Sequence, residues 1–587
     1  MPPAYRYEPL SSTSSEIRLL TLWPGSWDDD ISCTVDHACV DNHPYYEALS
    51  YTWGDANDTR PIRLNGGPFQ IAKNLEIALH YFRPQPGEQP RLLWVDAICI
   101  NQKDLGERGQ QVQKMRQIFT SARRVLAWTG EADEDSAGVL DLIDDIAKIS
   151  PRHWMAAARA WSTEPIPLRD GGVLDLSKRD WTSLRNFLDR PYWRRVWIVQ
   201  ELTSATPLGP LDAGKDTLAI FCGFRSFSRY AFEMVCLFWE WAFTGRFARF
   251  KTDDFQRGAW ALYIYLSTSK ASTLGEDPSL IELVRSVGRL EASDPRDRVY
   301  AVLGLTDLDK TLIAPDYTKT VEQVYIDLVK CCILAYGNCN ILSGNQTRRL
   351  HGGPSWCCID EFMGSTLIDF DAAGKTSACI DFDDQNGSMT ATGLHVGAIR
   401  TVVGPMFPTQ TFPEAFVDIG AWNQIPEMIA LQKIAHSLGE AQQETLCRCI
   451  LMDAGMTTEH SVYSGLEEAH RFLRSVLGLP SLPDRGQQYL LSAVRADYRV
   501  MIHLLKLSKR HFFMTQCGKM GIGPNDMQTG DSVVVLYGGD SCFVLRPAGT
   551  RYTLQGDAYV QGIMHGELVK DLGEDGNPKN TRNFVIC

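Results

Sequence analysis

Three short stretches of the sequence hold polar and aromatic side chains in patterns that could bind or act on a ligand. They are Tyr46–Asp55, Leu92–Gln102 and Arg190–Leu202. The first predicts a short strand that ends in a turn at Gly54, because its aromatic residues favour strands and glycine interrupts them. Polar groups at the exit of a strand are where open α/β sheets build their sites. The alternative interpretation is a buried strand followed by an ordinary surface turn.

The second and third stretches each contain a carboxylate in an informative place. Leu92–Ile100 is almost continuously apolar, as in a central parallel strand, but Asp96 interrupts it. A carboxylate there must be hydrogen-bonded, paired or placed at the end of the strand. If Arg190–Leu202 is helical, Trp197 and Glu201 lie on one face because they are four residues apart.

Other catalytic chemistries find little support in the sequence. Cys99 lies within an apolar run and is interpreted as an inert buried thiol. Cys33, His37, Cys39 and His43 lie close together, but their spacing does not match a zinc site. The chain has no Gly-x-x-x-x-Gly-Lys loop, which argues against a nucleotide triphosphatase. We therefore predict no metal.

Charge and cysteine content narrow the class of protein. The 587 residues include 58 Lys plus Arg against 71 Asp plus Glu, a formal charge of −13, which argues against a nucleic-acid or acidic-membrane binder. The sequence has no apolar run of about eighteen residues, so we expect no membrane span. The N-terminus lacks the pattern of a secretory signal. The 16 cysteines are scattered without a Cys-x-x-Cys pair. Reduced thiols in a cytoplasmic protein are therefore expected.

Apolar periodicity and capping signals predict the elements that carry these side chains. Leu92–Ile100, a helix that begins after Asp104 and a strand at Val125–Trp128 together predict a βαβ unit. Glu107 completes a capping box with Asp104. The charges of Asp297 and Arg298, much later in the chain, are interpreted as a salt bridge and cap at another helix start.

The order of elements predicts four regions. Residues 1–45 form a lead-in that includes one strand, and residues 46–205 form an α/β domain with a mostly parallel sheet. Residues 206–500 are mixed and largely helical. Residues 501–587 contain short strands with regular turns, which are typical of a small meander or barrel.

Three ordered blocks closely resemble the fungal heterokaryon-incompatibility (HET) domain. They are Tyr46-Glu47-Ala48-Leu49-Ser50-Tyr51-Thr52-Trp53-Gly54, Trp94-Val95-Asp96-Ala97-Ile98-Cys99-Ile100-Asn101-Gln102 with the helix at Glu107-Arg108, and Arg190-Pro191-Tyr192-Trp193 through Glu201-Leu202. The resemblance covers residues 46–205. Asp294–Asp297 and the ending from Gly521 to Glu567 also resemble extensions that accompany this domain, whereas Trp356–Asp360 departs from the expected Trp-x-Pro-Asp-Trp pattern.

The resemblance implies an intracellular fungal protein of self/non-self recognition that triggers cell death when unlike hyphae fuse. The HET domain is thought to be distantly similar to Toll/interleukin-1 receptor (TIR) domains, which have a flavodoxin-like α/β fold, and some TIR domains cleave NAD. Their catalytic glutamate lies in a Trp-x-x-x-Glu motif, which Trp197–Glu201 matches. The resemblance thus implies Glu201 as the candidate catalytic residue, NAD as a candidate substrate, no required cofactor, and a protein partner or self-association.

Glu201 suits this chemistry because cleavage of the nicotinamide–ribose bond builds positive charge on the ribose. The leaving group is already a cationic pyridinium, so it departs neutral without a general acid, and one carboxylate can suffice. The candidate binding residues are Trp53 or Trp197 to stack on a flat base, Ser50, Asp96 and Asn101 to hold ribose or phosphate groups, Arg108 to pair with a phosphate, and Gly54 in the turn beside them.

Other interpretations stay open. Glu201 could be a structural partner of Arg194 or Arg195. The HET unit would then be a non-enzymatic signalling module that self-associates, and the C-terminal β unit would regulate it. The chain could also be an accessory protein of a specialised-metabolite gene cluster.

Overall fold

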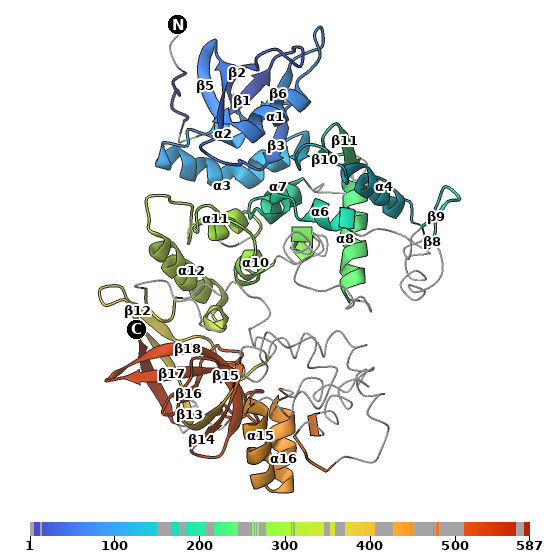
Figure 1. Cartoon of the computed structure of the whole chain (residues 1–587). Helices are drawn as coiled ribbons and strands as arrows, with labels where there is room; N and C mark the ends of the chain where they lie inside the picture. The colour runs from blue at the N-terminus through green and yellow to red at the C-terminus, as the bar shows by residue number, and fades with distance from the viewer. Residues whose placement is uncertain are drawn as a thin grey trace. The chain divides into compact units, whose positions relative to one another are not determined.

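The computed structural model divides the chain into two compact units, Met1–Val321 and Glu322–Cys587, each of which is described by itself (Figure 1). No helix of the described part is both long and apolar enough to cross a membrane. The region boundaries expected at residues 45, 205 and 500 stay predictions. The structure describes residues 5–11, 14–149, 166–174, 182–205, 216–244, 261–262, 264–265, 267–268, 278–306, 308, 312–344, 353–357, 370–404, 426–450, 452, 473–474, 477–480, 510–570 and 580–587.

The N-terminal unit is built on a nine-stranded sheet whose four central strands are parallel. In spatial order these are β10 (Leu218–Cys222), β7 (Arg124–Trp128), β3 (Glu47–Tyr51) and β6 (Arg91–Trp94). All five residues of β3 are buried, as expected of a central strand covered on both faces. The sheet continues with β11 (Arg225–Ser228) at one edge and with β1 (Glu16–Leu22), β2 (Ser32–Cys39), β4 (Thr59–Leu64) and β5 (Gly67–Ala72) at the other.

The sheet as a whole is mixed, so the expectation of a mostly parallel sheet holds only for its central strands. Four of the eight pairings among its described strands are antiparallel. The β4–β5 pair shows one reason: Asn65 and Gly66 both have positive φ, as in a tight hairpin turn, and such a turn reverses the chain. The expected lead-in also contributes both β1 and β2 to this sheet.

The strand predicted at Leu92–Ile100 is shorter than expected. β6 ends at Trp94, and Asp96–Cys99 forms a single helical turn, α2. The turn closes because the amides of Cys99 and Ile100 donate to the carbonyls of Val95 and Asp96. Asp96 therefore lies just beyond the end of the strand, which is one of the placements that its charge allowed.

Helix α3 (Leu105–Ser121) confirms one half of the predicted capping box. The Asp104 carboxylate accepts hydrogen bonds from the amides of Gly106 and Glu107. Glu107 does not complete the box, because its side chain pairs with Arg18 instead. The other helices described in this unit include α1 (Lys73–Phe82), α4 (Ser136–Ala147), α6 (Thr182–Leu188), α7 (Ile198–Ser204), α8 (Arg229–Thr244), α10 (Leu280–Val287) and α11 (Asp297–Leu303).

The C-terminal unit contains a closed β-barrel. Its strands pair in the order β13, β14, β15, β18, β17 and β16, and β16 pairs again with β13, which closes the ring. This confirms the barrel alternative, although β13 precedes the region in which the β unit was expected. The strands are β13 (Ser388–Val403), β14 (Arg510–Thr515), β15 (Met520–Pro524), β16 (Ser532–Leu536), β17 (Cys542–Ala548) and β18 (Arg551–Val560), with β12 (Ile380–Asp383) and β19 (Thr581–Ile586) pairing along β13 outside the ring.

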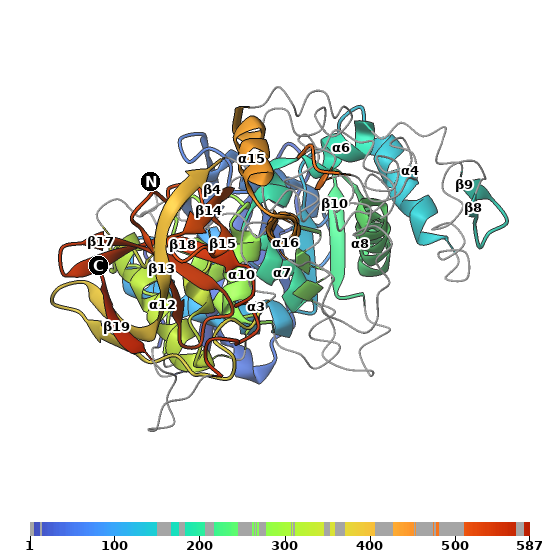
Figure 2. The ribbon, with the colours of Figure 1, turned by 90° about the horizontal axis from the view of Figure 1, so that it is seen from below.

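Helices complete this second unit. It begins with α12 (Val321–Tyr336), and α15 (Pro426–Ser437) and α16 (Glu440–Ile450) pack on the barrel against β13 and β15 (Figure 2). A fully buried ion pair joins two of its strands, since Arg510 Nη2 lies 2.6 Å from Asp557 Oδ1.

Candidate active site

The structure brings four of the predicted site residues together at the carboxyl end of the central strands. β3 and β6 are parallel neighbours with Ala48 opposite Trp94, so Ser50 on β3 and Asp96 after β6 leave the sheet at the same edge. Trp53 follows β3, and α7 places Glu201 against Ser50. Helix and strand positions far apart in the sequence thus converge where α/β sheets build their sites.

Glu201 is the buried centre of this cluster. Its Oε2 accepts a hydrogen bond from Ser50 Oγ, and Ser50 Oγ lies 2.8 Å from the Tyr192 hydroxyl. Arg195 Nη1 lies 3.8 Å from the same carboxylate oxygen. The residue is only 3% exposed, and burial raises the pKa of Glu201 to about 7. The charge of Arg195 and the hydrogen bond from Ser50 lower this pKa and offset part of the rise.

Trp53 and Asp96 form the accessible part of the cluster. The indole Nε1 of Trp53 donates to Asp96 Oδ2 at 2.8 Å, and Trp53 is 40% exposed. Burial raises the pKa of Asp96, and the charge of Arg195 offsets part of this rise. Arg195 also donates to the carbonyl of Tyr51, so it is fixed to β3 while its charge acts on both carboxylates. The result is one connected group of two carboxylates, one cation and one exposed indole.

The other predicted binding residues are engaged elsewhere. The amide of Asn101 donates to Glu107 Oε1 at 2.7 Å, and Gly54 is an exposed turn residue with φ +78° directly after Trp53. Arg108 lies 3.8 Å from Asp297 Oδ2, and its guanidinium stacks 3.6 Å from the ring centre of Tyr317. Trp197 Nε1 donates to Asp297 Oδ2 at 3.1 Å. The carbonyl of Trp197 accepts from the amide of Glu201 at 3.1 Å, but the indole of Trp197 and the guanidinium of Arg108 are directed to Asp297. The binding roles of these four residues stay predictions.

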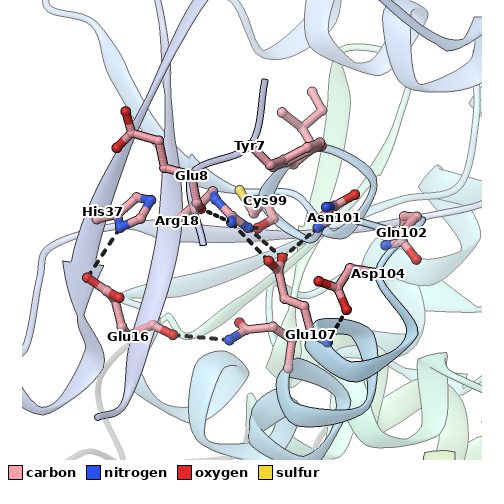
Figure 3. Close-up of polar contacts among 12 residues, drawn as sticks. Tyr7, Glu8, Glu16, Arg18, His37, Cys99, Asn101, Gln102, Asp104 and Glu107 are labelled. Carbon is pink, nitrogen blue, oxygen red and sulfur yellow. Dashed lines mark hydrogen bonds and ion pairs between the residues drawn. The ribbon is translucent and has the colours of Figure 1, made fainter. Parts of the chain in front are cut away.

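Asn101 belongs to a second polar network, which holds β1 onto α3 (Figure 3). Arg18 is fully buried and forms a two-pronged ion pair with Glu107, with its Nη1 and Nη2 2.6 and 3.0 Å from the two carboxylate oxygens. Arg18 also donates to the carbonyl of Cys99 at 3.0 Å, and the ring of Tyr7 lies under its guanidinium. Both terminal nitrogens of Arg18 and both carboxylate oxygens of Glu107 are used within the chain, so we assign this network a structural role.

Sequence reasoning missed some contributors to the site. Tyr192 was part of a matched block but received no role, although the run Pro191-Tyr192-Trp193 could have drawn attention to it. Arg195, foreseen only as a structural partner of Glu201, contacts it, whereas Arg194 pairs with Asp189 and Glu291. Asp297 does not cap α11; its carboxylate accepts from Trp197 and Tyr317 instead. Among the described residues, no three potential metal ligands gather into a site.

Two family models match the chain. Residues 46–201 match the model described as "Heterokaryon incompatibility protein (HET)", and residues 488–575 match the "Het-6 beta-barrel domain". Two regions of the chain are therefore similar to the HET domain and to the Het-6 barrel, and this confirms the resemblance found in the sequence.

A particular relative extends the likeness beyond the two matched domains. The chain is 26% identical to "Heterokaryon incompatibility protein 6, OR allele" from Neurospora crassa, over 95% of each protein. No solved structure matches the chain. The likeness to TIR and flavodoxin-like folds accordingly stays a prediction.

Proposed function

We propose that this protein acts in the cytoplasm in fungal non-self recognition, and that its HET domain triggers cell death by cleaving NAD at the nicotinamide–ribose bond. The family match and the relative's name support the recognition role. The observation that carries the enzymatic part is the Glu201 carboxyl, fixed by Ser50 and faced by Arg195 at the carboxyl end of the central strands.

The reaction needs a carboxylate and no acid. The bond between ribose C1′ and the pyridinium nitrogen breaks with both electrons going to nicotinamide, which leaves neutral. Water then bonds to C1′ and releases a proton, giving ADP-ribose. A negative charge beside the ribose stabilises the oxocarbenium-like transition state. With a pKa of about 7, Glu201 is ionised in about half of the molecules at neutral pH.

The neighbouring residues have roles that follow from their contacts. Ser50 orients the Glu201 carboxyl, and Arg195 favours its ionised form. The exposed indole of Trp53 offers a face on which a flat base can stack, and its hydrogen bond to Asp96 fixes the orientation of the ring. Asp96 is placed to accept hydrogen bonds from ribose hydroxyls.

Nicotinamide release by the purified full chain tests this proposal. The protein is incubated with NAD at high concentration, and nicotinamide and ADP-ribose are separated by chromatography. We expect Glu201→Gln to reduce the rate by about 100-fold or more, because it removes the charge that stabilises the transition state. Glu76→Gln is the control, since Glu76 pairs with His80 on α1 and takes no part in the cluster. Equal rates for wild type and Glu201→Gln would reject Glu201 as the catalytic residue, and no release at all would reject NAD cleavage.

A second candidate function, protein recognition without catalysis, is favoured by a surface aromatic cluster. Trp27 is 50% and Phe224 is 74% exposed, and both pack on Tyr81, with ring centres 5.1 and 4.5 Å away. Exposed aromatic side chains of this kind are enriched at protein interfaces. If wild type and Glu201→Gln kill fungal cells equally while Phe224→Ala does not, recognition becomes the better account.

A further inference from the structure

A segment outside both matched regions holds the helix that carries Glu201. The HET match ends at residue 201, inside α7. About ninety residues later along the chain, the loop before α11 and α11 itself return to α7 at three positions. We call the three returning residues, Glu291, Asp297 and Ala301, the α7 clamp.

The first contact fixes the chain just before α7. Glu291 pairs with the backbone of residues 194–196 as an isolated β-bridge. The amide of Val196 donates to the carbonyl of Glu291 at 3.0 Å, and the amide of Glu291 donates to the carbonyl of Arg194 at 2.5 Å. Arg195 lies between these two bonds, so the bridge also holds the backbone of the residue whose guanidinium faces Glu201.

The second contact fixes the start of α7 through a buried carboxylate. Asp297 accepts from Trp197 Nε1 at 3.1 Å through one oxygen and from the Tyr317 hydroxyl at 2.7 Å through the other. Arg108 on α3 lies 3.8 Å from the first oxygen. Asp297 is buried and both of its oxygens are used, so its side chain has one well-defined position.

The third contact lies one residue before Glu201. With the Gln200 amide assigned to the orientation that satisfies both of its ends, its nitrogen donates to the carbonyl of Ala301 at 2.8 Å and its oxygen accepts from the backbone amide of Arg116 at 2.8 Å. Arg116 in turn donates to the carbonyl of Gly304 at 2.6 Å. Gly304 lies close to this contact, because a Cβ there would lie 2.8 Å from the amide end of the Gln200 side chain.

We propose that the α7 clamp is part of the catalytic module, and that Asp297 is a positioning residue that keeps Glu201 against Ser50. Residues 196, 197 and 200 are all held by the clamp, so the next residue has little freedom to move away from β3. A site group must stay within about 0.5 Å of its working position, which a seven-residue helix does not achieve alone. The catalytic part of this inference rests on the proposed NAD cleavage.

Two measurements on the full chain test the clamp. Hydrogen exchange followed by mass spectrometry reports on the backbone of residues 196–204, and nicotinamide release reports on catalysis. We expect Asp297→Ala to raise exchange in this peptide by about 10-fold and to lower kcat by about 10-fold with KM little changed. Trp197→Phe keeps an aromatic ring but removes the donor to Asp297, and it should give smaller changes in the same directions. It also remains informative if Asp297→Ala fails to fold.

A control separates positioning from general destabilisation. Tyr46→Phe deletes the buried hydrogen bond from the Tyr46 hydroxyl to the carbonyl of Ile118, and neither partner belongs to residues 196–204 or to the α7 clamp. The clamp is overturned if exchange in residues 196–204 is unchanged in Trp197→Phe, or if Tyr46→Phe raises it equally. If the exchange result holds while the wild type releases no nicotinamide, the clamp stands and only the proposed chemistry fails.

Discussion

The pKa of Glu201 is shifted further than that of an ordinary surface carboxylate, and this shift makes the stability of the fold depend on pH. Its pKa in the folded protein is about 7, above the usual value of 4.5. Below pH 4.5 both folded and unfolded chains hold the proton, so the shift has no cost. Between pH 4.5 and 7 the unfolded chain loses the proton first, so stability falls as pH rises, by about 3 kcal/mol in total.

The Glu201→Gln variant checks this stability difference because it cannot ionise. Urea unfolding of both proteins is measured at pH 5 and pH 8. We expect the variant to gain stability relative to wild type by roughly 3 kcal/mol as pH rises, since all other titrating groups cancel in the comparison. A difference that is the same at both pH values would show that Glu201 is not buried as described.

Ionisation of Glu201, which lowers the stability of the fold, should raise the rate of catalysis. NAD cleavage as proposed uses the ionised carboxyl, so nicotinamide release should rise about 10-fold between pH 6 and pH 8 and level off above the pKa. The rate is measured at saturating NAD in one mixed buffer. A flat profile would contradict an ionising Glu201 as the catalytic group. The protonated form of Glu201, in which the fold is more stable, is then the form that cannot react.

At the residue scale, the sequence predicted site residues whose positions follow from a local rule. It did not predict contacts between residues that are far apart in the chain. Ser50 and Asp96 follow from the rule that sites lie at strand exits, and the structure brings them to one edge. Arg108 was predicted to contact a phosphate, yet Asp297 and Tyr317 occupy its guanidinium. Those partners lie about 190 and 210 residues further along, and no periodicity relates them to Arg108.

At the element scale, the predicted helix after Asp104 was accurate while the strand before it was too long. Asp104 is a local signal, and its carboxylate caps α3 as expected. The apolar run Leu92–Ile100 could be a buried strand or a buried helical turn, because periodicity does not distinguish the two in short runs. The structure ends the strand at Trp94 and places Asp96 in the turn at the sheet edge.

Helix α3 offers a matched pair of glycines that tests its packing. A Cβ at Gly109 would lie 2.8 Å from the carbonyl oxygen of Pro315, whereas at Gly106 the nearest contact is an ordinary 3.4 Å. Alanine favours a helix over glycine by about 1 kcal/mol, but the clash at residue 109 costs about 1–3 kcal/mol. We expect Gly109→Ala to lower the free energy of unfolding, and Gly106→Ala to leave it unchanged or raise it slightly.

Urea unfolding of the two variants measures the difference. If Gly109→Ala is as stable as Gly106→Ala, the chain around Pro315 does not pack on α3 as described. That outcome would also weaken the case for the α7 clamp, because Tyr317, two residues further on, is a partner of Asp297.

At the scale of the whole molecule, ring closure could not be predicted from local patterns. The short strands after residue 510 indicated a meander or a barrel, but closure depends on β13, more than a hundred residues earlier. β13 pairs with β14 at one end and with β16 further along, and both pairings include an irregularity in register. The sequence pattern of one strand does not show that it has two partners.

The division into two compact units predicts that each unfolds with its own transition. The buried pair of Arg510 and Asp557 gives a way to weaken the second unit alone. Arg510→Met leaves the Asp557 charge without its partner, which costs about 3–5 kcal/mol. Replacing both residues, as in Arg510→Met with Asp557→Leu, removes the stranded charge and should restore much of the loss.

Two probes distinguish the units during this unfolding. Calorimetry follows the whole chain, whereas tryptophan fluorescence follows mainly the first unit, because all but two of the 15 tryptophans, Trp356 and Trp422, precede residue 322. For Arg510→Met we expect one calorimetric transition to move to lower temperature while the main fluorescence midpoint stays in place. If both move together, the two units unfold as one, and a signal received by the barrel could reach the HET domain through shared stability.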